Sequence, residues 1–210
     1  MKQFDARWRT LAACMSAVAG FVDAVGFIGT GGFFVSFMSG NSTRMAVAAP
    51  MAVMTAAAAA GLIASFVAGV IIGSLLGRTV GRVRRPVVLL LVATIVAMAA
   101  LMVRIGPMWS VFALAALAMG AENTVFETGG EVRLGVTYMT GALVKTGQHL
   151  ATALTGGERW GWLPYLGLWS GLVGGAVIGA LAYPIFGLEA LWIAALALLG
   201  LAVVAWRLES

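Results

Sequence analysis

Long stretches without charge are the feature that most constrains how this chain can fold. No charged residue occurs between Arg44 and Arg78 or within residues 86–103. A transmembrane helix needs about 20 mostly apolar residues to cross the hydrocarbon core of a bilayer. Six segments fit this description and are predicted to be spans: residues 10–28, 54–76, 86–103, 109–126, 163–181 and 188–206. Only 10% of the residues are charged, against about a quarter in soluble domains. We therefore expect an all-α membrane protein with the lipid bilayer as its main partner.

Basic residues predict the orientation of these spans. The second predicted span is followed closely by a group of four arginines: Arg78, Arg82, Arg84 and Arg85. Loops rich in Lys and Arg stay in the cytoplasm, so this loop and both chain termini are predicted to be cytoplasmic. The net charge of +5 is explained by membrane topology, and we expect no nucleic-acid partner.

Reactive side chains are scarce. Cys14 and His149 are the only cysteine and the only histidine. One cysteine excludes an internal disulfide and a multi-cysteine metal site, and we expect Cys14 to pack within the first helix. The sequence offers no convincing nucleophile–base pair and no paired histidines. We therefore expect neither an enzyme nor a bound metal or cofactor.

The two halves of the chain share a series of landmarks. The corresponding positions are Asp23 and Asn123, Gly40 and Gly141, and glycines 69, 73 and 77 with glycines 171, 175 and 179. Their offsets are nearly constant, so we predict two related three-span halves, residues 1–108 and 109–210. Three spans are an odd number, so the second half must insert upside down relative to the first. Many secondary transporters are built from such inverted repeats, and some channels are too. The glycines are expected to form sliding or dimer contacts between helices.

Two segments are too short and too polar to be simple spans: residues 33–49 and 135–154. The glycines at 29, 31 and 32 weaken helical structure just before the first of them. Non-helical backbone at membrane depth is tolerated only when protein buries it or when it lines a cavity. Both segments are therefore predicted to be broken or re-entrant, and the function is expected where they meet the spans.

Two acids and an amide are the first candidates for a site. A carboxylate inside a membrane costs several kcal/mol unless it is paired, hydrated or protonated. Asp23 could couple transport to protons or cations, which is the favoured interpretation, or it could form a structural bond to the nearby polar cluster. Glu122 and Asn123 form the second polar pair. Glu122 could be a second coupling group, but a plain helix-end acid in cytoplasmic water is the favoured alternative.

Basic and small polar residues complete the candidate site. Arg44 and Lys145 occupy equivalent positions and could bind an anionic substrate or pair with the two acids. Alternatively, their long side chains could reach the headgroups at opposite interfaces. The small residues could cap half-helices whose amino ends attract anions, or they could make ordinary interhelical bonds: Ser39, Gly40, Asn41, Thr43, Thr140 and Gly141.

The motif VDAVGFIGTGGFFVSFMSGNSTRMAVA, with YMTGALVKTG later in the chain, resembles the YoaK family of bacterial membrane proteins, also called domain of unknown function 1275. Glu122 stands where the family usually has glutamine, and Glu127 stands near the place of a usual arginine. The resemblance implies a six-span protein of the bacterial inner membrane. The inverted repeat and the candidate site residues predict a secondary transporter for a small anionic or polar solute, with proton coupling and a homodimer as further expectations. A channel and a membrane scaffold are the alternatives.

Overall fold

The computed structural model describes residues 5–128, 131–132 and 135–209, and nearly all of them are helical. These residues form eight α-helices: α1 Ala6–Thr30, α2 Met38–Ala48, α3 Val53–Thr79, α4 Arg84–Ile105, α5 Met108–Glu122, α6 Met139–Leu154, α7 Leu163–Phe186 and α8 Leu191–Glu209. Single 3₁₀ turns precede α4 and α8, and a hairpin of two-residue strands, β1 Glu127–Thr128 and β2 Glu131–Val132, follows α5. The predicted helical class is confirmed, apart from this small hairpin.

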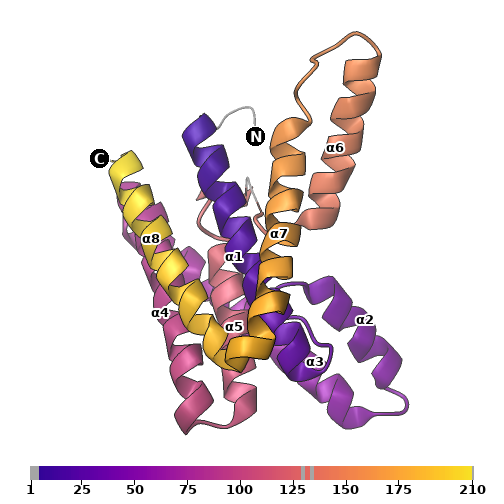
Figure 1. Cartoon of the computed structure of the whole chain (residues 1–210), viewed down its shortest axis with the longest axis vertical. Helices are drawn as coiled ribbons and strands as arrows, with labels where there is room; N and C mark the ends of the chain where they lie inside the picture. Colours follow the sequence, from indigo (N-terminus) through magenta and orange to yellow (C-terminus); the bar gives the residue numbers. More distant parts are fainter. Residues whose placement is uncertain (1–4, 129–130, 133–134, 210) are drawn as a thin grey trace.

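Four stretches are long and apolar enough to cross a membrane, namely α1, α3, α4 and residues 163–209. The last stretch contains both α7 and α8. The chain turns back between them at Gly187, whose φ of 57° lies in the left-handed region that favours glycine. Because of this turn the two helices run in opposite directions (Figure 1).

Helix α5 is shorter than the predicted span over residues 109–126. It has 15 residues and ends at Glu122, so it is about 22 Å long at 1.5 Å per residue. The hydrocarbon core is about 30 Å thick. Each of the six predicted spans coincides with a helix, but α5 is too short to cross the core unaided.

Three helix pairs make the most extensive contacts: α1 with α7, α3 with α5, and α4 with α8. The short helices α2 and α6 lie at opposite ends of the molecule, beside α3 and α7 respectively (Figure 1). Both chain ends lie at the same end of the molecule. One continuous apolar core joins residues from α1, α4, α5 and α8. Cys14 is exposed, so the expectation that it packs within the fold was wrong.

Glycines bring α1 and α7 into backbone contact. A Cβ atom added to Gly175 would collide with the carbonyl group of Ala17, and one added to Gly20 would collide with that of Leu172. Small residues allow such close approach between membrane helices. The two glycines therefore set the distance between α1 and α7.

The contact between α3 and α5 is built in the same way. A Cβ atom on Gly69 would meet the carbonyl of Leu117, and one on Gly120 would meet that of Phe66. Gly69 thus has the same kind of environment as Gly175. The constant offset had paired Gly69 with Gly171, which lies one helical turn earlier. These glycine faces are used within the chain, so they are not dimer contacts. The homodimer itself stays a prediction.

Candidate functional site

Asp23 anchors the segment that leads from α1 to α2. Its Oδ1 atom accepts hydrogen bonds from the backbone N–H groups of Val35 and Ser36, each at 2.8 Å. The chain can reach this position because α1 ends at Gly31 and Gly32, with φ values of 69° and 118°. A left-handed glycine is a common way to end a helix and reverse the chain. In this contact Asp23 has the structural role that was the less favoured interpretation.

Asn123 makes the corresponding contact at the end of α5. Its Oδ1 accepts a hydrogen bond from the backbone N–H of Thr137 at 3.4 Å, and its Nδ2 donates to the carbonyl of Met119 at 3.0 Å. Ser36 and Thr137 are separated by the same number of residues as Gly40 and Gly141. In each half, therefore, a side chain within a core helix or directly after it holds the segment that precedes a short helix.

Substitution of Asp23 should separate its structural contribution from its charge. Asn in this position keeps an acceptor oxygen, so Asp23→Asn should fold with little change in stability. Ala leaves two N–H groups unpaired, at about 1–3 kcal/mol each when buried. For a chain of this size we expect Asp23→Ala to lower Tm by roughly 5–10 °C. The Tm of both variants would be measured by thermal unfolding in detergent, and size-exclusion chromatography would show whether each variant is folded. Equal Tm values for Asp23→Ala and wild type would exclude the structural role of Asp23.

Asn41 forms two hydrogen bonds with the backbone of Phe34, and the second half has no asparagine at the equivalent position. It is fully buried, its Oδ1 accepts from the N–H of Phe34 at 3.0 Å, and its Nδ2 donates to the carbonyl of Phe34 at 2.6 Å. The equivalent residue of α6 is Ala142. Gly40 is crowded by aromatic rings, whereas Gly141 faces open space. Asn41 thus stabilises the path of the chain around Phe34, and the two Ser/Thr-Gly motifs differ in their surroundings.

The two basic candidates lie apart from the acids. The guanidinium of Arg44 lies 4.4 Å from the ring centre of Phe33 and donates a hydrogen bond to the carbonyl of Gly32. Lys145 is exposed, with Nζ 5.5 Å from the ring centre of Tyr165. Within the described part of the chain, neither forms an ion pair with the acids of α1 and α5.

The remaining small polar candidates are exposed on α2 and α6. Ser39 and Thr43 bond within α2, where the hydroxyl of Thr43 donates to the carbonyl of Ser39 at 3.2 Å. Thr140 is exposed on α6. Neither short helix has a side-chain hydrogen bond at its amino end. These three residues therefore do not form the half-helix caps that the sequence offered as one alternative.

Glu122 lies in the interior of the protein. It is 0% exposed, so the favoured expectation of an acid in cytoplasmic water was wrong. Neither carboxyl oxygen has a hydrogen-bond partner among the described residues. An unpaired charge in an apolar interior is costly. The equivalent position of the first half is Val22, an ordinary core residue. Packing therefore gives no reason for an acid at this position.

An ion pair that the sequence did not predict lies at the arginine-rich end of the molecule. Nη2 of Arg84 is 2.8 Å from Oε2 of Glu127, although not in hydrogen-bond geometry, and both side chains are largely buried. Ser74 donates to the same carboxylate oxygen at 2.6 Å, and Nε of Arg84 donates to the carbonyl of Thr124 at 3.2 Å. The arginines were interpreted mainly as a signal for membrane topology, and this ion pair was not predicted. The departure of Glu127 from the family pattern was the one signal that could have suggested this pair.

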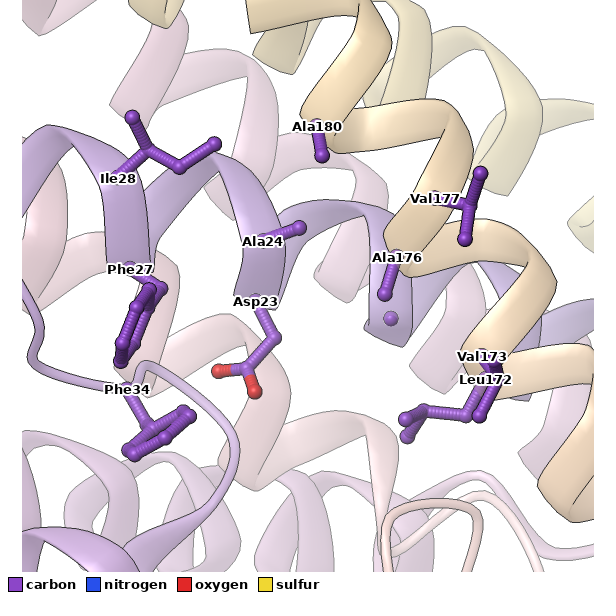
Figure 2. A pocket seen from close by; sticks show the side chains of 11 residues that line it. Asp23, Ala24, Phe27, Ile28, Phe34, Leu172, Val173, Ala176, Val177 and Ala180 are labelled. Carbon is purple, nitrogen blue, oxygen red and sulfur yellow. The ribbon is translucent and has the colours of Figure 1, made fainter.

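A hollow of about 460 Å³ lies between α1 and α7 beside Asp23. Figure 2 shows the carboxylate of Asp23 in this hollow, near the rings of Phe27 and Phe34, with Ala176 on the facing helix. Ten of the eleven lining residues are apolar, and Asp23 is the one polar member. The hollow therefore brings one acid together with an apolar surface.

Long apolar helices, joined through backbone contacts and buried polar anchors, define this chain as an α-helical multi-pass membrane protein. A family model described as "Protein of unknown function (DUF1275)" matches residues 11–204, and the chain belongs to this family. The resemblance predicted from the sequence is thus confirmed. A relative from Rhizobium meliloti (strain 1021), UPF0700 transmembrane protein RA0705, is 40% identical over 198 residues, which cover 94% of this chain and 86% of the relative. No solved structure matches the chain.

Proposed function

We propose that this protein is a secondary transporter, not an enzyme, built from two inverted three-span halves, residues 1–108 and 109–210. The observation that carries this proposal is the reciprocal packing of the long helices. Helix α1 packs on α7 through close backbone contacts, and α5 packs on α3 in the same way. In the repeat, α1 corresponds to α5 and α7 corresponds to α3. Exchanging the two halves therefore converts one contact into the other. Inverted repeats that pack across each other in this manner are typical of secondary transporters.

Two further observations support the repeat. The anchors on Asp23 and Asn123 hold corresponding segments, and the short helices that follow lie at opposite ends of the molecule (Figure 1). Helix α2 has 11 residues and α6 has 16. Because α6 is longer than α2, equivalent positions of α3 and α7 lie about one helical turn further apart in the sequence than the constant offset predicted.

Transport would proceed by rocking of one half against the other, which would open the surface between α1 and α7 to one side of the membrane and the equivalent surface between α3 and α5 to the other side, in turn. Glu122 is the better place for a coupling proton, because Asp23 already accepts two backbone hydrogen bonds, whereas the carboxyl group of Glu122 has no hydrogen-bond partner in the part of the chain that the structure describes. Arg78 and Arg84 favour a cytoplasmic position for this end of the molecule, and hence for both termini, in the bacterial inner membrane.

Cysteine labelling from either side of the membrane tests alternating access. In a Cys14→Ala background, Ala176→Cys would report on α7, and Val70→Cys would report on the equivalent position of α3. Both positions are half-buried. We expect a membrane-impermeant maleimide to label Ala176→Cys in vesicles of one orientation and Val70→Cys in vesicles of the other. Leu196→Cys on α8, whose native side chain is 67% exposed on the apolar surface, should stay unlabelled in both.

The alternatives give different patterns. A channel would let the reagent reach both positions from either side, and the reconstituted protein would carry ionic currents far above carrier turnover rates. A scaffold would leave both positions unlabelled in vesicles of either orientation. Either pattern would overturn the transporter proposal.

A further inference from the structure

We propose that the hollow beside Asp23 binds an organic cation with an apolar body. This extends the proposed function by naming a class of ligand. It differs from the anionic or polar solute expected from the sequence, because that expectation rested on Arg44 and Lys145. Neither of these residues lines the hollow.

Charge is the first argument. Asp23 is the one titratable side chain that lines the hollow, and the other lining side chains are apolar. Asp23 forms no ion pair with any residue in the described ranges. A carboxylate on an apolar wall is stabilised by a cation placed next to it. The charge that complements this hollow is therefore positive.

The aromatic rings are the second argument. Phe27 and Phe34 lie with their ring centres 4.7 Å apart and line the same hollow as the carboxylate. The face of an aromatic ring attracts cations, most strongly where water is excluded. Arg44 shows the same preference, because its guanidinium stacks on the ring of Phe33, the residue before Phe34. An organic ammonium or phosphonium group could contact Asp23 and these rings together.

Size and access are the third argument. A volume of about 460 Å³ lies within the range of roughly 300–1,000 Å³ that small-molecule sites occupy. A bare metal ion would leave most of this volume empty, and Ca²⁺ takes about six to eight oxygen ligands. The rim is open, since Phe27, Ile28 and Val177 are 39%, 42% and 54% exposed. An amphiphilic cation could therefore enter from the bilayer.

Two ions of matched shape and opposite charge test the proposal directly. Saturable binding of tetraphenylphosphonium and of tetraphenylborate would be measured by equilibrium dialysis on the full chain in detergent. We expect saturable binding of the phosphonium ion only. Asp23→Asn should weaken that binding at least tenfold, because it removes the charge and keeps the acceptor oxygen that holds the loop.

Two matched variants control for indirect effects. Glu189→Gln removes an acid that does not line the hollow, and it should leave phosphonium binding unchanged. Ala176→Phe should block the hollow, whereas Gly174→Leu adds bulk to the same helix at a position that faces open space. The proposal is overturned if Asp23→Asn binds as tightly as wild type, if the borate ion binds equally well, or if the folded wild type shows no saturable phosphonium binding.

The cation could belong to a free solute or to the amine headgroup of a lipid, which present the same chemistry. Nanodiscs of phosphatidylglycerol alone and with phosphatidylethanolamine distinguish the two sources. Weaker phosphonium binding in the second type would identify the lipid amine, and equal binding would identify a free solute. Because binding is measured at equilibrium, a failed labelling experiment would refute transport without removing the cation site. Alternating labelling without phosphonium binding would refute the ligand class alone.

Discussion

Replacing Gly175 with alanine is expected to lower the stability of the folded protein by about 2–3 kcal/mol, the upper range for overpacking a close contact. The added Cβ atom would collide with the carbonyl group of Ala17. A backbone atom cannot rotate away as a side chain can, so α1 and α7 must move apart. For a protein of this length the loss corresponds to a fall in Tm of roughly 5–10 °C, measured by thermal unfolding in detergent.

The neighbouring glycine is a matched control. Gly174 lies on the same helix, but an added Cβ atom there meets open space. Since alanine favours helices over glycine by about 0.5–1 kcal/mol, Gly174→Ala should be as stable as wild type or slightly more stable. Gly69→Ala should be destabilised like Gly175→Ala, because it occupies the equivalent contact with α5. Equal Tm values for the variants at 174 and 175 would mean that the backbone contact does not determine the helix spacing.

Breaking the ion pair between Arg84 and Glu127 is the second change with a large expected effect. Loss of one partner of a buried pair costs about 3–5 kcal/mol, because the other charge is left without compensation. We therefore expect Arg84→Gln to lower Tm by roughly 10 °C and to reduce the yield of monodisperse protein. The double variant with Glu127→Gln should recover much of this loss, since it leaves no unpaired charge.

An exposed ion pair in the same protein provides the control. Nε of Arg104 lies 2.7 Å from Oε1 of Glu189, but the two side chains are 73% and 31% exposed. Exposed pairs contribute only about 0–1 kcal/mol, so Arg104→Gln should change Tm by no more than about 2–4 °C. If Arg84→Gln were as mild as Arg104→Gln, the buried pair would not connect α3, α4 and the segment after α5 as the structure indicates.

The positions of the helices could be predicted from the sequence because they depend on local properties. A helix in lipid satisfies its own backbone hydrogen bonds, so an uninterrupted apolar stretch is sufficient to indicate one. The spacing between Asp23 and Asn123 indicated corresponding positions in the two halves, and in the structure each of these side chains holds the segment before a short helix. Helix α5 was predicted too long because apolar residues continue beyond Glu122 into a turn.

The roles of the candidate site residues were harder to predict, because they depend on which helices face each other. Sequence placed Glu122 at a helix end, and only the packing around α5 buries it. Arg44 was a candidate partner for the acids, but the turn at Gly32 brings a carbonyl group and an aromatic ring closer to it. The constant offset paired Gly69 with Gly171, but the equivalent contact is made by Gly175, one helical turn later. The glycines of α7 recur every four residues, so the extra length of α6 shifts the pairing by one turn without interrupting the glycine pattern.

The sequence by itself determined that this chain is an α-helical membrane protein and where its long helices lie. It also indicated that Asp23 and Asn123 occupy corresponding positions in the two halves. Only the tertiary structure decided that Glu122 is buried without a hydrogen-bond partner among the described residues, that Arg84 pairs with Glu127, and that Asp23 lines an apolar hollow between α1 and α7. The physical reason is that hydropathy and helix length are sums over neighbouring residues. Burial and pairing, in contrast, arise between residues that are distant in the chain and meet only when the helices pack.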